Sequence, residues 1–205
     1  MIEDISLLDL NKKYTYADYL TWRFKERVEL IRGKVFKMSP APSRKHQEII
    51  GELFNQLYST LKKNPWQVFI APFDVRLPLK KGNKAESVVH PDICIVCDES
   101  KLDDKGCNGA PDLIIEILSP NTSRKDTQDK FVLYEENQVK EYWLVYPGEG
   151  LLDVYKLNEK EKYYLDKKYT RTDPVPVGIF NDLTIDLTEV FEEDEWQDPP
   201  GTVRI

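Results

Sequence analysis

The stretch Pro111-Asp-Leu-Ile-Ile-Glu-Ile-Leu118 holds one carboxylate, Glu116, inside an otherwise apolar run. An apolar run of this length predicts a strand that is covered on both faces. A second such run, Ile93-Cys-Ile-Val-Cys97, begins directly after Asp92. An ionised carboxylate buried in such a strand costs several kcal/mol unless a partner neutralises it.

These two acids allow two interpretations. If Asp92 and Glu116 lie on neighbouring strands, they repel each other, and a divalent cation is the simplest partner that neutralises both. If they lie apart, Asp92 belongs to a turn and Glu116 to a salt bridge. The residues alone leave both interpretations open.

The clearest helix signal outside these strands is an amphipathic segment from about residue 43 to 63. Its apolar residues recur at helical spacing; they are Ile49, Ile50, Leu53, Phe54, Leu57, Tyr58 and Leu61. A second helix is expected from about 124 to 137, after a loop rich in capping residues. Thr15 is a candidate cap for a short helix near the N-terminus.

Further strands are expected at 67–77 and 141–146, with hairpins at both ends of the chain. The order helix, strand, strand, strand, helix, strand predicts an α/β fold with a mixed central sheet flanked by helices. We expect a single domain over residues 1–205. Its parts are a core at about 14–150, a β-rich addition at 151–188 and an acidic peripheral tail at 189–205.

Composition excludes several classes of protein. Of the 205 residues, 40% are hydrophobic and 32% are charged, which is typical of a chain that folds in water. No apolar run approaches the ~18 residues needed to cross a bilayer, and the acidic start Met1-Ile-Glu-Asp is unlike a signal peptide. We therefore expect a cytoplasmic protein with no membrane association.

The charge of −7 is unevenly distributed. Residues 189–205 contribute −5 of it, so the body is nearly neutral and lacks a strongly basic footprint for nucleic acid. Five bases and no acid lie between Leu30 and Gln47, where they could form a local positive patch or an ordinary solvated surface. The bases are Arg32, Lys34, Lys37, Arg44 and Lys45.

The cysteines Cys94, Cys97 and Cys107 are expected to be free thiols. The CxxC spacing of the first two suggests zinc or redox chemistry, but positions three apart on a strand point to opposite faces. His46 and His90 are the only histidines, and they do not complete a tetrahedral zinc site.

Several segments together resemble the Uma-two family of restriction endonucleases, which belongs to the PD-(D/E)XK nuclease superfamily. The segments are Pro91-Asp92, Pro111 to Pro120, Arg124-Lys-Asp126-x-x-x-Lys130-x-x-x-Tyr134, Val139 to Val145, the Glu29-Leu-Ile-x-Gly33 hairpin and His46. The resemblance covers roughly Tyr14 to Asp186. It implies a restriction-endonuclease-like core, a Mg²⁺ or Mn²⁺ site and hydrolysis of phosphodiester bonds in DNA.

The resemblance also implies a set of site residues. Asp92 matches the aspartate of the motif and Glu116 matches its second acid. Both would hold the metal ion together with the backbone carbonyl of Ile117. The lysine that the motif has two residues after its second acid is replaced here by Leu118.

Lys130 in the following helix matches the lysine that substitutes for the missing one in this family. It would orient the attacking water or neutralise the transition state. The alternative is an exposed i, i+4 pair with Asp126. His46 is an auxiliary candidate, although its helical stripe with Ile50 and Leu53 favours a packing or capping role.

Two functions are compatible with these features. One is a metal-dependent DNA endonuclease, which the joint presence of Asp92, Glu116 and Lys130 favours. The other is a nuclease fold kept as a binding or assembly module with weak or no catalysis, which Leu118 and the near-neutral body favour. We prefer the first. The strands at 152–157 and 163–165 exceed a minimal core and predict a symmetric homodimer.

Overall fold

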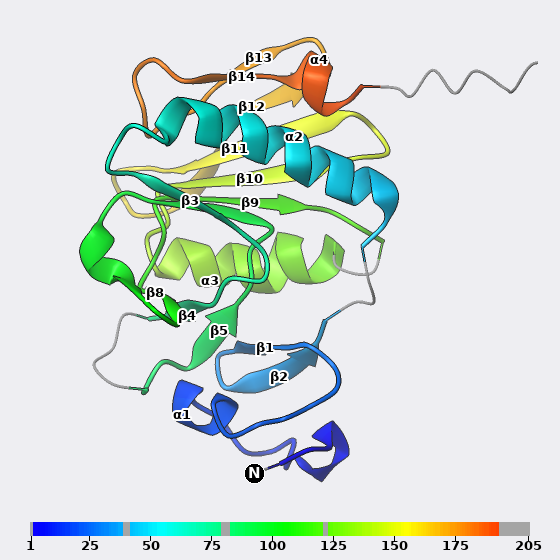
Figure 1. Ribbon diagram of the computed structural model, residues 1–205, viewed down its shortest axis with the longest axis vertical. Helices are drawn as coiled ribbons and strands as arrows, with labels where there is room; N and C mark the ends of the chain where they lie inside the picture. Colours follow the sequence, from blue (N-terminus) through cyan, green and yellow to red (C-terminus); the bar gives the residue numbers. More distant parts are fainter. Residues whose placement is uncertain (1, 39–41, 79–82, 121–122, 193–205) are drawn as a thin grey trace, which may run out of the picture.

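The computed structural model describes residues 2–38, 42–78, 83–120 and 123–192 (Figure 1). A mixed central sheet runs through the upper part of the molecule. From one edge to the other it contains β12 (Tyr163–Thr170), β11 (Leu151–Leu157), β10 (Glu141–Tyr146), β9 (Leu113–Ile117), β6 (Ile93–Val96) and β3 (Gln67–Ile70). Strands β9 and β10 are parallel, and the other neighbours are antiparallel.

Helices cover both faces of this sheet, as the sequence predicted. The long helix α2 (Arg44–Leu61) lies on one face and α3 (Phe131–Glu136) lies on the other (Figure 1). Side-chain alternation along β9 explains this, because Leu113, Ile115 and Ile117 share a core with α2. Residues 114 and 118 share the opposite core with α3. Glu116 therefore faces the α3 side.

A second sheet lies below α3 (Figure 1). Its order is β2 (Lys34–Lys37), β1 (Val28–Ile31), β5 (Ser87–Val89), β4 (Val75–Leu77), β8 (Gly106–Asn108) and β7 (Leu102–Asp103). The short 3₁₀ helices η1 (Ile5–Leu7) and η2 (Glu99–Lys101) flank it. The helix α1 (Tyr16–Tyr19) begins after Thr15, whose backbone N–H donates to Asp18 in a capping box, as expected.

Two expectations about the strands and helices need correction. The single strand expected over 67–77 is divided between β3 and β4, which belong to different sheets. Pro72 lies between them and cannot donate to a strand ladder. The helix expected over 124–137 begins as a π-helix, η3 (Lys125–Lys130), before it continues as α3.

The C-terminal segment packs on the far side of α2. It contains β13 (Pro174–Pro176), β14 (Thr184–Asp186) and α4 (Leu187–Val190). Val190 and Phe191 are buried in the same core as α2. The peripheral tail that was expected from residue 189 onward therefore does not begin at that residue. Residues 193–205 of the acidic tail lie outside the described residues. Among the described helices, none is long and apolar enough to cross a membrane.

Candidate active site

Asp92 and Glu116 lie at the same end of two adjacent central strands. Ile93 of β6 stands opposite Ile115 of β9 in the antiparallel ladder. The residue before Ile93 therefore faces the residue after Ile115 across the strand pair. In addition, the backbone N–H of Ile117 donates to Asp92 Oδ2 at 2.7 Å. The two acids are thus neighbours, which was the condition for a shared cation.

Lys130 reaches the same place from the helix that follows β9. Its Nζ atom lies 2.8 Å from Glu116 Oε1, 2.9 Å from Glu29 Oε1 and 3.5 Å from Asp126 Oδ1. The side chain is only 3% exposed. The alternative i, i+4 pair with Asp126 is also present, but it is buried and not exposed, and the ammonium is shared among three carboxylates.

The π-helical turn explains how two lysines reach one carboxylate. A π-helix closes i to i+5 hydrogen bonds, so residues five apart lie above one another. Lys125 and Lys130 have this spacing, and both pair with the carboxylate of Glu29. An α-helix would instead align residues i and i+4 and turn one of the two lysines away. π-turns of this kind are frequent at functional sites.

Glu29 is a member of the cluster that the sequence did not predict, because it was expected only as part of a hairpin. It is completely buried in β1, where the backbone N–H of His90 also donates to its Oε1 at 3.1 Å. Burial alone would raise its pKa, but the ammoniums of Lys130 and Lys125 outweigh that effect and lower the pKa to about 2. The signal in the sequence was the same as for Glu116, an acid inside an apolar strand.

Glu116 is in the opposite electrostatic situation. Its Oε1 accepts hydrogen bonds from Lys130 and, at 2.9 Å, from the Tyr134 hydroxyl. Burial is nevertheless the largest influence and raises its pKa well above the usual value, and the nearby carboxylates of Asp126 and Asp92 raise it further. The ammonium of Lys130 opposes these effects without cancelling them.

His46 also belongs to this cluster. It lies in the first turn of α2, where its backbone N–H donates to the capping Ser43. Its Nε2 atom lies 3.1 Å from the carbonyl oxygen of Ile117 and 3.3 Å from Asp92 Oδ2. Burial lowers the pKa of this imidazole, but the Asp92 carboxylate outweighs burial and raises it. The ring thus contacts the site residues, in addition to the expected capping contact of its backbone.

The oxygen atoms at this end of the sheet fit a magnesium-type ion. Across the described ranges, no three histidine, cysteine or acidic side chains form a ready-made metal site. The oxygen donors at this end of the sheet are the carboxylates of Asp92 and Glu116 and the carbonyl of Ile117. Mg²⁺ keeps several waters and needs only one or two carboxylates, so this donor set suits it. These hard oxygen ligands point away from zinc.

The cysteines lie within or directly after strands β6 and β8. All three are free thiols, as expected. Cys94 is buried in the core on the α3 side of β6, whereas Cys97 packs against the core on the α2 side. The CxxC spacing therefore sends the two sulfur atoms to opposite faces of the sheet, as strand alternation predicts.

Comparison with known proteins agrees with this architecture. The sequence model of the Uma2 family, described as "Putative restriction endonuclease", matches residues 16–188. Two uncharacterized proteins from Synechocystis sp. are 25% and 27% identical over 150 and 139 residues. These matches cover 72% and 65% of this chain and 76% and 75% of the relatives.

A solved structure has the same fold. It is a crystal structure from Anabaena variabilis described as a putative nuclease belonging to DUF820. The two chains superpose with a TM-score of 0.65 at 22% sequence identity, over 87% of this chain and 97% of the other. At this identity the likeness shows the fold alone. The expected nuclease-like α/β fold with a mixed sheet is thereby confirmed.

Proposed function

Because this chain belongs to the Uma2 family, we propose that it is a metal-dependent endonuclease that hydrolyses phosphodiester bonds in DNA. One observation carries the proposal. The ammonium of Lys130 is buried 2.8 Å from Glu116, whose strand neighbour is Asp92. A lysine thus lies beside the acids, although the position at which the motif has its lysine, 118, holds leucine.

The roles follow from the contacts. Asp92, Glu116 and the carbonyl of Ile117 would hold Mg²⁺ or Mn²⁺. Such an ion supplies Lewis-acid chemistry and lowers the pKa of a water. The ammonium of Lys130, fixed by Glu116 and Glu29, stabilises negative charge that develops on the phosphate oxygens. His46 contacts both Asp92 and Ile117, so it positions two of the oxygen donors.

The basic residues near the site support a nucleic-acid substrate with modest affinity. Glu29 and His46 belong to the hairpin and the helix that carry the five bases of residues 30–47. Several of these bases form ion pairs: Arg32 with Glu136, Lys37 with Glu26 and Arg44 with Glu48. The pairing fits a surface that contacts phosphates without binding nucleic acid constitutively.

A cleavage assay tests the proposal. Plasmid and short single-stranded DNA are incubated with the protein in Mg²⁺, in Mn²⁺ and in EDTA. We expect cleavage only with a metal ion, and a loss of about a hundredfold or more in Asp92→Asn and Glu116→Gln. Glu141→Gln is the matched control, because Glu141 is a buried acid at the other end of β10, where it stands opposite Leu113 of β9. Equal cleavage by all variants would contradict the assignment.

The alternative function is a nuclease fold that serves as a binding or assembly module. It is favoured by the hydrogen bonds that Lys130 and Tyr134 give to Glu116, since this network is satisfied without a metal ion. Calorimetric titration with Mg²⁺ and Mn²⁺ separates the two functions. A protein that binds neither ion at millimolar concentration and cleaves no DNA would fit the module.

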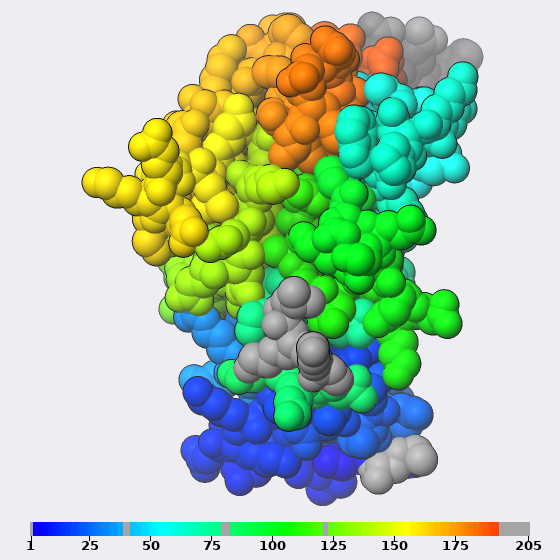
Figure 2. Space-filling model, turned by 90° about the vertical axis from the view of Figure 1, so that its left-hand side faces the viewer, coloured from blue at the N-terminus to red at the C-terminus, as the bar shows by residue number. Residues whose placement is uncertain are grey.

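We also propose that the protein forms a homodimer through the edge of its central sheet. Leu152 and Val154 of β11 are buried in the core of the chain itself. The neighbouring β12 is the edge strand and exposes Tyr164 and Leu165. Figure 2 shows residues of this yellow segment protruding from the side of the molecule. An exposed edge strand can pair with a second copy around a twofold axis.

A further inference from the structure

A pocket of about 500 Å³ lies beside the candidate active site. It is formed where the segment from α1 to β1 meets the residues that precede β4 and β6. Tyr19, Trp22, Phe24 and Arg27 line it together with Asp74 and His90. Its volume falls in the range of sites for small organic groups.

One wall of the pocket is aromatic. The rings of Trp22 and Phe24 are stacked with their centroids 5.3 Å apart. The ring of Tyr19 meets Trp22 edge to face at 5.8 Å. Tyr19 and Phe24 are only half-buried, so they can offer ring surface to a planar group. Aromatic surfaces of this kind stack on nucleobases regardless of their identity.

Asp74 and His90 form a polar part of the lining. His90 Nε2 lies 2.9 Å from Asp74 Oδ1 and 3.4 Å from the Tyr19 hydroxyl. The Nδ1 atom of His90 is buried without a hydrogen-bond partner in the described part of the chain. The side chain of His90 is only 6% exposed. The side chain of Asp74 is 23% exposed, so its carboxylate can accept hydrogen bonds from a ligand that carries N–H groups.

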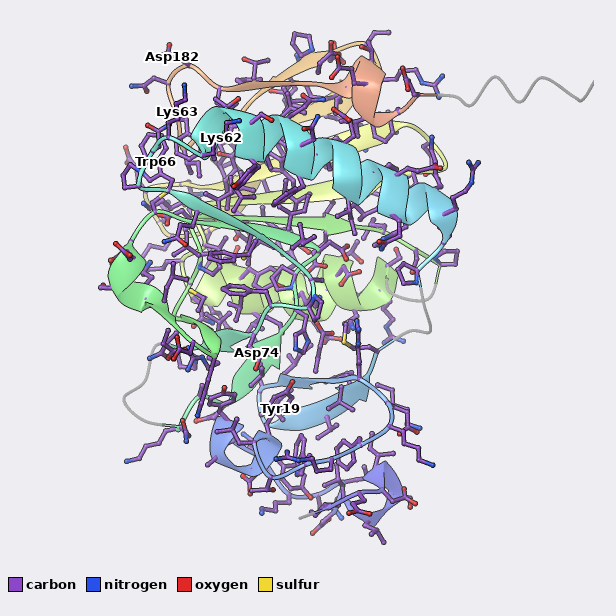
Figure 3. All side chains as sticks on the ribbon, in the orientation of Figure 1. Tyr19, Lys62, Lys63, Trp66, Asp74 and Asp182 are labelled. Carbon is purple, nitrogen blue, oxygen red and sulfur yellow. The ribbon has the colours of Figure 1, made fainter. Side chains whose placement is uncertain are left out.

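Backbone hydrogen bonds link the lining of the pocket to the candidate active site. The backbone N–H of His90 donates to Glu29, which pairs with Lys130. The backbone N–H of Ala71, the residue before the pocket residue Pro72, donates to the carbonyl of Asp92 at 3.1 Å. Figure 3 shows Tyr19 and Asp74 in the half of the molecule below the central sheet, at the opposite end from Trp66 and Asp182.

We propose that this pocket binds one base of the DNA strand that crosses the active site, and that it prefers bases with an exocyclic amino group. The substrate class rests on the proposed nuclease function. The aromatic wall accounts for stacking, and the carboxylate of Asp74 accounts for the preference. Acidic side chains accept a hydrogen bond from the amino group of cytosine, whereas thymine has no such donor. Arg27 is exposed at the rim, where it can meet the phosphate of the same nucleotide.

Binding of two oligonucleotides tests this proposal without any cleavage. Fluorescence anisotropy is measured in EDTA with labelled oligo(dC) and oligo(dT) of about twelve nucleotides. We expect oligo(dC) to bind at least about fivefold more tightly than oligo(dT). Asp74→Asn should remove most of that preference, because the amide offers one acceptor and a competing donor. Phe24→Ala should weaken the binding of both oligonucleotides about tenfold, because a stacking surface is lost.

Phe180→Ala is the matched control. Phe180 is also half-buried and also pairs with a tryptophan, Trp66, with ring centroids 4.3 Å apart. It is far from the pocket, so binding should not change. Equal affinity of the parent for the two oligonucleotides, or no binding of either, would overturn the proposal. If Phe24→Ala fails to fold, the loss of preference in Asp74→Asn decides alone.

The two proposals fail in different ways. A protein that cleaves DNA with Mg²⁺ but shows no base preference in EDTA retains the nuclease function and loses the base pocket. A protein that prefers oligo(dC) in an Asp74-dependent manner but cleaves nothing retains the pocket and loses the nuclease function.

Discussion

The ammonium of Lys130 lies 2.8 Å from Oε1 of Glu116, and the two side chains are only 3% and 4% exposed. Lys130 is fourteen residues further along the chain, in the helix that packs on the same face of β9. Leu118 also points to this face, as strand alternation requires. The helix lysine thus approaches Glu116 from the side on which a lysine at position 118 would lie.

We predict that Glu116→Gln is at least as stable as the parent at pH 7 without metal. A carboxyl whose pKa is raised by folding adds stability below its unfolded pKa, near 4.5, and loses it as the pH rises toward its folded pKa. At neutral pH an ionised Glu116 is therefore a burden that glutamine removes. Urea unfolding in EDTA measures this, and a loss of about 2 kcal/mol or more would contradict it. Mn²⁺ should raise the Tm of the parent only.

Lys130→Met should reduce both stability and cleavage. Removal of one partner from a buried ion pair costs about 3–5 kcal/mol, and loss of the ammonium should lower the cleavage rate about a hundredfold or more. Cleavage is measured at a temperature where circular dichroism shows a folded variant. Lys140→Met is the control, because Lys140 is the partner of the buried Asp112, 2.7 Å away, outside the site. If Lys130→Met cleaves as fast as the parent, the helix lysine has no catalytic role.

Restoring the lysine of the motif should recover part of the lost activity. The double variant Lys130→Met/Leu118→Lys places an ammonium on the Glu116 side of β9, where Leu118 is 8% exposed. We expect it to cleave faster than Lys130→Met alone, although the buried charge can cost several kcal/mol. Lys130→Met/Leu118→Met is the uncharged control. Equal rates in the two double variants would show that position 118 cannot replace Lys130.

Glu29→Gln should make the protein less stable at pH 7 and less sensitive to acid. The pKa of Glu29 falls from 4.5 to about 2 on folding, so its contribution is present above pH 4.5 and is lost as the pH falls toward 2. The contribution is roughly 3 kcal/mol. In urea unfolding, the difference in unfolding free energy between the variant and the parent should become smaller as the pH falls from 4.5 toward 2. Glu141→Gln is a control, because burial raises the pKa of Glu141. The contribution of Glu141 to stability should therefore change with pH in the opposite direction. A constant difference at all pH values would refute the linkage.

Light scattering tests the homodimer. We expect a particle of about twice the 24.0 kDa chain mass at micromolar concentration. Replacing Tyr164 and Leu165 by lysine should produce a monomer, since both are more than 40% exposed on the edge strand and charge blocks edge pairing. A monomeric parent protein would rule out the proposed interface.

The sequence by itself determined the elements whose signals are local. The apolar runs around Glu116 and after Asp92 predicted two strands, and the helical stripe of residues 43–63 predicted α2, which runs from Arg44 to Leu61. Each of these signals depends on neighbouring residues and on the period of one element. The resemblance to the family then identified Asp92, Glu116 and Lys130, which the fold brings together.

Only the tertiary structure decided how these charges are neutralised. Glu29 is 96 residues before Lys125, yet the two side chains form an ion pair. The π-turn that directs both lysines to Glu29 has no local sequence signal, and it also buries Lys130, which the helix pattern alone left exposed. His46 was an auxiliary candidate for which the spacing with Ile50 and Leu53 favoured a packing or capping role. In the structure the end of the sheet lies beside the first turn of α2, so its ring contacts Ile117. Burial and charge pairing depend on the approach of distant segments, and spacing along one element does not contain that information.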